Sequence, residues 1–236
     1  MLYTSKAIVL KKIRYSDNSF ITHMFTEEHG HQTFLISKGS GKNKKASALL
    51  FPLTILEISS DLNPKRDIQR IKSMHIDIPF QTVPFDHRKS AIAQFLSEVY
   101  FECIKTDIEN RQLFNFLKTS IEILDIIEHN IDLFHLKNML ELSRQMGFFP
   151  TNNYSDSHPY FNVANGKFTN RKEMGSANKD VSLQLSLLDT FSDIENFRPE
   201  IKFEVGEILN VLVNYFEIHL ESFKKPKSMD VFRMLI

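Results

Sequence analysis

The spacing of apolar residues changes near residue 80 of this 236-residue chain. Before that point, short runs of β-branched and aromatic residues alternate with turn residues, a pattern typical of β-strands. We expect five strands, over residues 6–12, 20–25, 33–37, 53–59 and 67–76. The segment 27–31 predicts a hairpin turn in which Gly30 adopts a positive φ. Five strands this short favour a small closed barrel over a sandwich, because closure leaves no exposed edge.

Beyond Pro84 the apolar period lengthens to that of an α-helix. From Ile92 to Ile104 apolar residues recur three and four positions apart, the spacing of one helix face. Similar stripes predict helices over 111–128, 132–146, 181–191 and 200–223, and a short one from Ser228. Gly147 and Pro150 follow the stripe over 132–146, as expected at a helix end. The predicted fold class is therefore α+β, with a barrel followed by an all-α domain.

A segment rich in Asn, Ser and Gly, residues 148–180, interrupts the helical part. Within it, residues 160–168 predict a small hairpin around Asn165-Gly166. Structureless loops of this length are uncommon in compact domains. We therefore expect an irregular subdomain over 148–180.

The charges are divided unequally along the chain. The whole sequence holds 29 Lys and Arg against 29 Asp and Glu, so its formal net charge is zero. Residues 1–80 hold 12 basic and 7 acidic side chains, net +5, and the remainder is net −5. Because salt screens exposed charges within about 8 to 10 Å, the local balance decides which partner is attracted. A neutral total therefore does not argue against a nucleic-acid partner for the barrel.

The basic residues of the predicted barrel occupy a loop and two strands. The loop after the third strand holds four lysines and two glycines, and the loop cations are Lys38, Lys42, Lys44 and Lys45. The strand cations are Lys11, Lys12, Arg14 and Arg70. Clustered cations on a Gly-rich backbone suit phosphate contacts without sequence readout, as in grooves for single strands. The alternative is a solvated surface loop, and the spacing of a P-loop is absent.

Other chemistry-bearing residues favour structural roles. His23, His29 and His31 lie near two glutamates, but the Glu-Glu-His-Gly-His order is not that of a helical zinc motif, so we expect no metal there. Cys103 is the single cysteine and lies in an apolar stripe, which predicts a buried, inert thiol. We find no nucleophile elbow, dinucleotide fingerprint or metal-ligand motif in the sequence, and expect no catalytic residue and no cofactor. Without an apolar run of about 18 to 20 residues, we expect a soluble, cytoplasmic protein.

Four short strings, in order, resemble the amino-terminal region of the RecO family. They are Ala-Ile-Val-Leu at 7–10, Tyr-Ser-Asp-Asn-Ser at 15–19, Phe-Thr-Glu-Glu-His-Gly at 25–30, and Lys38-Gly39. The helical part continues the likeness with Gly-Phe-Phe-Pro at 147–150, Tyr215, His219, Lys227 and Ser228. The resemblance covers nearly the whole chain and is strongest over residues 7–39. It implies an OB-fold over 1–80 that binds DNA, followed by a helical domain over 81–236.

The resemblance also implies a function and partners. RecO-like proteins are recombination mediators without catalysis. They bind single- and double-stranded DNA, anneal strands, contact the acidic tail of single-stranded DNA-binding protein (SSB), and act with RecR to help load RecA. By position, the lysines at 38 and 42–45 match the family's basic loop, and the protein would work at the nucleoid. Lys137 and Arg144, seven residues apart on one helix face, are our candidates for a cationic rim that binds the SSB tail.

One departure from the family concerns zinc. Many RecO-like chains carry two Cys-x-x-Cys pairs in the region equivalent to 148–180, whereas this chain has no cysteine there. We therefore expect no structural zinc, and expect apolar packing to replace it, from Tyr154, Tyr160, Phe161 and Phe168.

Two other functions remain open from the sequence. The barrel could serve as an adaptor that binds a partner protein and never touches DNA, because a fold does not fix a function. A hydrolase using His29 and His31 is the third hypothesis.

Overall fold

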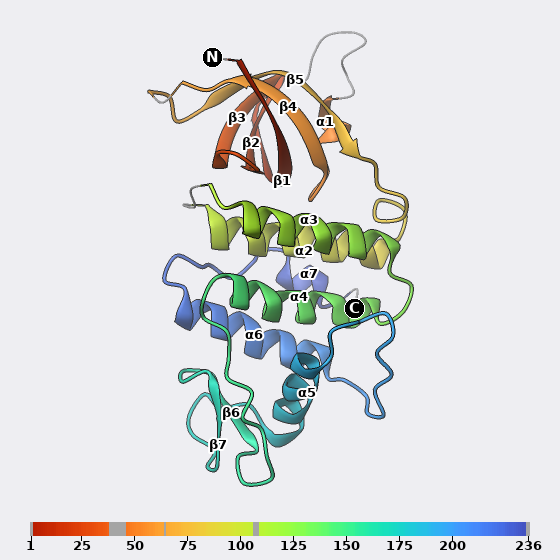
Figure 1. Ribbon diagram of the computed structural model, residues 1–236, viewed down its shortest axis with the longest axis vertical. Helices are drawn as coiled ribbons and strands as arrows, with labels where there is room; N and C mark the ends of the chain where they lie inside the picture. Colours follow the sequence, from red (N-terminus) through yellow and green to blue (C-terminus); the bar gives the residue numbers. More distant parts are fainter. Residues whose placement is uncertain (1, 38–45, 64, 106–108, 235–236) are drawn as a thin grey trace. The chain divides into compact units, whose positions relative to one another are not determined.

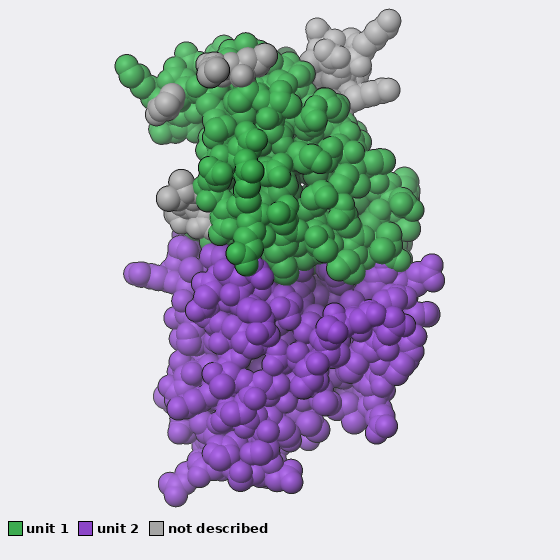
Figure 2. Space-filling model, in the orientation of Figure 1, with its two compact units in different colours: residues 1–126, 226–228 green, residues 127–225, 229–236 purple. Residues whose placement is uncertain are grey.

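The computed structural model describes residues 2–37, 46–63, 65–105 and 109–234, which form two compact units (Figures 1 and 2). The first unit contains residues 1–126 and 226–228, and the second contains 127–225 and 229–236. Strands give way to helices after Ile78, so the first unit holds helices as well as the barrel. The division near residue 80 into a DNA-binding and a partner-binding domain stays a prediction.

The five predicted strands are present and close into a barrel with the order β1-β2-β3-β5-β4. Their bounds are β1 (Leu2–Ser16), β2 (Ser19–Thr26), β3 (Gly30–Ser37), β4 (Ile55–Asp61) and β5 (Gln69–Ile78). The β3–β5 pair is parallel, and the other pairs are antiparallel. β1 is longer than predicted because its first half pairs with β4 and its second half with β2. The barrel followed by helices confirms the α+β prediction.

Alternate residues of the strands fill the barrel. The buried core contains Ala7, Val9, Phe20, Met24, Phe34, Ile36, Leu50, Leu56 and Ile58. Fully burying an apolar side chain of this size stabilises a fold by about 1.5 to 3 kcal/mol. Gly30 has a φ of 63°, as the hairpin turn requires. A short helix that the sequence pattern did not predict, α1 (Ala46–Leu49), precedes the core residue Leu50.

In the described part of the chain, six further helices follow the barrel. They are α2 (His87–Ile104), α3 (Arg111–Ile126), α4 (Ile131–Gln145), α5 (Lys179–Thr190), α6 (Val205–His219) and α7 (Met229–Phe232). The helix predicted over 200–223 is shorter than expected, since it begins at Val205 and ends at His219, and the backbone of the next residue, Leu220, is extended. Cys103 on α2 is 3% exposed, which confirms the buried thiol.

Asp125, near the end of α3, fixes the chain that leaves the barrel. Its carboxylate accepts hydrogen bonds from the backbone N–H groups of Gln81, Thr82 and Val83 at 2.7, 2.8 and 2.9 Å. The buried ammonium of Lys89 donates to the Asp125 carbonyl oxygen at 2.8 Å. Burial raises the pKa of Asp125, but the backbone N–H groups outweigh it and the net pKa is lowered. The barrel is thereby joined to α2 and α3 through a satisfied polar cluster.

In the second unit, β6 (Tyr160–Asn162) and β7 (Lys167–Thr169) form the hairpin expected around Asn165-Gly166. Gly166 has a φ of 62°, and a Cβ at this position would lie 2.9 Å from the hydroxyl of Tyr215. The rings of Phe161 and Phe168 are buried with centroids 5.2 Å apart, and Tyr154 packs edge-on to Phe168 at 5.5 Å. Aromatic packing thus forms the centre of the subdomain.

Candidate nucleic-acid interface

The outer face of β1, β2, β3 and β5 carries one row of side chains in register. Ile13 lies opposite Ile21, Ile21 opposite Leu35, and Leu35 opposite Arg70. Directly opposed residues project from the same side of a sheet, and the intervening residues Phe20, Phe34 and Ile36 face the core. With strands about 4.8 Å apart, the row is about 14 Å long. Ile13 is 42% exposed, Ile21 and Leu35 are half-buried, and Arg70 is exposed, so the row is a partly open apolar strip that ends in a cation.

Two of the candidate cations lie on this outer face. Lys11 stands opposite His23, and its ammonium is 4.2 Å from the ring centroid of Phe101 on α2. Arg70 ends the apolar row. The structure therefore brings Lys11 and Arg70 to one face, where Lys11 is half-covered by an aromatic ring and Arg70 is open.

Lys12 and Arg14 alternate to the other side of the β1–β2 ribbon. Lys12 lies opposite the buried Thr22, and its ammonium is 5.4 Å from the ring centroid of Phe20. Arg14 is exposed and pairs with Asp17 at 2.5 Å. Within the described part of the chain, Lys12 and Arg70 form no ion pair. The four candidate cations of the strands thus divide between two faces.

The loop candidates Lys38, Lys42, Lys44 and Lys45 lie outside the described residues. Their contribution stays a prediction from the sequence. β3 ends at Ser37, which pairs with Ser19 beside the β1–β2 turn. The chain therefore leaves β3 at the end of the barrel where Arg14 lies.

The histidines divide between two aromatic clusters. His23 and His31 stack with centroids 5.4 Å apart, and Phe101 contacts both rings, whereas His29 packs edge-on to Tyr3 at 4.6 Å. Burial lowers the pKa of His31 to about 4, and the neighbouring His23 adds to the effect. Burial also lowers the pKa of His23, followed by the charge of Lys11. His29 and His31 thus pack in different aromatic clusters, and these contacts lend no support to a hydrolase that uses both.

Phe101 of helix α2 covers part of the outer barrel face, around His23, His31 and Lys11. The row from Ile13 to Arg70 lies beyond these contacts. The sequence reading missed Ile13, Tyr15 and Phe101 as parts of this surface. Strand alternation relates Ile13 to Lys11 and is the signal that could have found Ile13. Tyr15 lies at a register shift of β1, and nothing local to the sequence indicates Phe101.

The candidate cations of the second unit are brought together and matched by acids. Lys137 lies 3.0 Å and Arg144 lies 3.2 Å from the carboxylate of Glu141. Arg144 also pairs with Asp189 at 3.1 Å, while Lys137 donates to the Asp189 carbonyl oxygen at 3.3 Å. The guanidinium of Arg144 lies 3.5 Å from the ring centroid of Phe149. These two cations therefore already have intramolecular partners.

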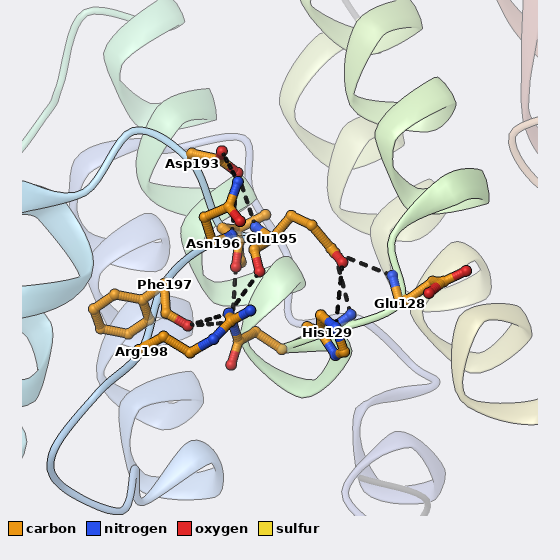
Figure 3. A network of polar contacts seen from close by, with 9 residues as sticks. Glu128, His129, Asp193, Glu195, Asn196, Phe197 and Arg198 are labelled. Atoms are coloured by element: carbon orange, nitrogen blue, oxygen red, sulfur yellow. Dashed lines mark hydrogen bonds and ion pairs between the residues drawn. The ribbon is translucent and has the colours of Figure 1, made fainter.

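A polar network ties the loop after α5 to the turn before α4 (Figure 3). Glu195 accepts from the backbone N–H groups of Glu128 and His129, at 3.1 Å each. Arg198 donates to the carbonyl oxygens of Glu195 and Phe197 at 2.8 and 2.9 Å. The N–H of His129 lowers the pKa of Glu195 by stabilising its charged form. These side chains form hydrogen bonds with backbone groups of the two segments, so the role of the network is structural.

The subdomain over 148–180 holds no Cys-x-x-Cys pair. All of its residues are described, and it contains no cysteine. Across the described ranges, no three His, Cys, Asp or Glu side chains converge as metal ligands. The rings of Phe161 and Phe168 are buried in this subdomain, and the absence of structural zinc stays a prediction.

Comparison with known proteins places the chain in a family. Residues 1–79 match the family model described as the recombination protein O N terminal region. The DNA repair protein RecO of Flavobacterium psychrophilum is 33% identical over 236 residues, covering 99% of this chain and 98% of that protein. RecO of Bacteroides fragilis is 33% identical over 242 residues, covering 100% of this chain and 99% of that protein.

The chain belongs to the RecO family. This confirms the resemblance drawn from the four strings, and it assigns the chain to DNA repair and recombination as a non-enzymatic mediator. RecO of Phocaeicola vulgatus matches over the whole chain as well, at 29% identity. No helix among the described residues is long and apolar enough to cross a membrane.

Proposed function

We propose that this RecO protein binds single- and double-stranded DNA through its barrel, anneals complementary strands, and with RecR helps load RecA onto SSB-coated single strands. The observation that carries the proposal is the partly open outer row, in which Ile13, Ile21 and Leu35 lead to the exposed Arg70. Full-length relatives named as DNA repair proteins support it.

The proposed mechanism is electrostatic. Lys12 and Arg70, with the loop lysines Lys42, Lys44 and Lys45, neutralise phosphates and so lower the repulsion between two strands. Annealing by charge neutralisation needs no nucleotide hydrolysis. DNA binding and annealing would take place at the nucleoid, in the cytoplasm.

We place the recruitment of partners on the second unit. The SSB tail is acidic, and Lys137 and Arg144 lie beside the rings of Phe191 and Phe149. To bind a carboxylate of the tail, these cations would first have to release their internal partners, Glu141 and Asp189. Because one ion pair replaces another, we expect the affinity of the second unit for the SSB tail to be modest and sensitive to salt.

The loop lysines give the first test. Replacing Lys42, Lys44 and Lys45 with Ala should weaken binding to all DNA sequences almost equally, because phosphate contacts carry no sequence information. For each phosphate that the variant no longer neutralises, the slope of log affinity against log salt should fall by about 0.7 for single strands. Fluorescence anisotropy across a salt series measures both quantities.

Annealing assays with SSB present and absent complete the test. We expect the wild-type protein to accelerate annealing of SSB-coated strands, and the triple variant to do so less. Affinity that is nearly independent of salt would contradict the proposal and favour the adaptor, in which the barrel binds a protein partner. Unchanged affinity in the triple variant alone would remove the loop from the interface.

A further inference from the structure

Tyr15 is an exposed aromatic residue at the end of the β1–β2 ribbon. Its side chain is 66% exposed. The pairing of β1 with β2 steps from Arg14 opposite Phe20 to Ser16 opposite Ser19, so Tyr15 is an extra residue with no counterpart. Such a β-bulge re-aims the side chain that it carries. Tyr15 is therefore held at the tip of the barrel by backbone pairing on both sides of it, and its ring stays open to solvent.

The surroundings of Tyr15 combine apolar surface with positive charge. Ile13, two residues before it, begins the partly open row that continues through Ile21 and Leu35 to Arg70. Lys12 and Arg14 lie close by in sequence, and Asp17 is the acid that pairs with Arg14. Exposed rings and aliphatic side chains beside exposed cations suit a ligand made of flat apolar groups joined by phosphates.

Unpaired nucleobases fit this chemistry better than the alternatives. A duplex presents its phosphates but hides the faces of its bases in the stack, so it would use the cations and not the ring. An acidic peptide would use the cations, but it supplies no flat faces in regular succession. Every nucleobase has a π-face, so stacking on tyrosine tolerates any sequence.

We propose that Tyr15 stacks on an unpaired base, with Ile13 beside it and Arg70 contacting the strand's backbone at the far end of the row, and that this contact makes the barrel prefer single strands over duplexes. The inference rests on the proposed DNA binding and adds to it the residue and the source of selectivity. Phosphate contacts set the salt dependence, whereas stacking adds affinity that salt leaves largely unchanged.

The test uses the full chain and three probes of equal length. They are a labelled oligothymidylate, an abasic strand with the same phosphates, and a blunt duplex. The wild-type protein should bind oligothymidylate at least about fivefold more tightly than the abasic strand, the contribution expected of one stacked base. Tyr15→Ala should remove this difference while its affinity for the abasic strand and the duplex, and its salt slope, stay unchanged.

Two control variants separate stacking from other effects. Tyr15→Phe keeps a ring and should bind all three probes as the wild-type protein does. Phe85→Ala removes a ring that is 80% exposed and lies outside the strands, and it should also leave binding unchanged. Because neither Tyr15 nor Phe85 packs in the core, thermal unfolding should be the same in every variant.

Each other outcome overturns the inference. If Tyr15→Ala matches the wild-type protein on oligothymidylate, or if the wild-type protein binds abasic and base-bearing strands equally, stacking is excluded while salt-dependent DNA binding keeps the proposed function. Equal weakening on all three probes would assign Tyr15 to the fold of the ribbon. If the wild-type protein binds none of the probes, the inference and the proposed function both fail.

Discussion

Two pairs of cations differ in what already neutralises them: Lys12 and Arg70 of the barrel, and Lys137 and Arg144 of α4. Lys12 and Arg70 are exposed and, among the described residues, without an ion-pair partner. Lys137 and Arg144 share Glu141, and Arg144 also binds Asp189. A cation with an internal partner gains less from an external phosphate, because that partner must first be displaced.

The difference indicates how each unit uses charge. The barrel carries charge on its outer surface while its interior is apolar. In the second unit, Glu195, Arg198 and Asp189 bind groups of the same chain, and they hold loops and helices together. Lys12 and Arg70 are thus available to ligands, although Lys6, Arg14 and Lys72 of the barrel are ion-paired, whereas Lys137 and Arg144 are held by acids of their own chain.

The largest expected effect is on the free energy of unfolding at low pH, because protonating a buried histidine would place a charge inside the second unit. His135 on α4 is fully buried, and burial lowers its pKa to about 3 from an ordinary value of 6.5. Above pH 6.5 the imidazole is neutral in both the folded and the unfolded state. As the pH falls below 6.5, only the unfolded state takes up the proton, so the free energy of unfolding should fall by about 3 kcal/mol between pH 7 and pH 4.

Urea unfolding at several pH values measures this decrease. His135→Leu should flatten the acid branch of the curve, because it removes the titrating group at similar volume. His31 in the barrel, with a pKa of about 4, will contribute in both proteins. The same pH dependence in wild type and variant would show that His135 is not the group responsible.

The second prediction tests the comparison directly with matched pairs. Lys12→Ala with Arg70→Ala, and Lys137→Ala with Arg144→Ala, each remove two positive charges. The barrel pair should weaken single-strand binding by about tenfold or more at low salt and reduce the salt slope by about 1.4. The α4 pair should leave both quantities nearly unchanged, and should lower the free energy of unfolding by about 1 kcal/mol. Equal loss of DNA affinity in the two pairs would contradict the division of roles.

The sequence predicts the elements of this molecule better than the surfaces they build. Periodicity indicates all five strands, since alternation is local, but the length of β1 depends on its pairing with β4, which lies about 50 residues away along the chain. The same alternation separates Lys11 from Lys12 onto opposite faces, although their adjacency in sequence groups them. The contact of Lys11 with Phe101 and of Arg144 with Asp189 depends on how helices pack. No short-range pattern encodes those contacts.

The smallest expected effect concerns the ion pair between Arg144 and Asp189. The Asp189 side chain is 17% exposed and that of Arg144 is 48% exposed, so solvent screens the pair only in part. Asp189→Asn keeps the shape and removes the charge, and it should lower the free energy of unfolding by about 0.5 to 1 kcal/mol. DNA affinity should not change.

A double-mutant cycle isolates this pair from the other contacts of each side chain. Arg144 also lies over Phe149 and pairs with Glu141, so Arg144→Gln alone reports the sum of these contacts. The coupling free energy between Asp189→Asn and Arg144→Gln cancels the contacts that each side chain makes with other residues, and leaves the interaction between the two. A coupling of about 0.5 kcal/mol would assign the charge of Arg144 to stability. A coupling of zero would mean that Arg144 gives up little by leaving Asp189, so that Glu141 would be the acid that still competes with an external ligand for its charge.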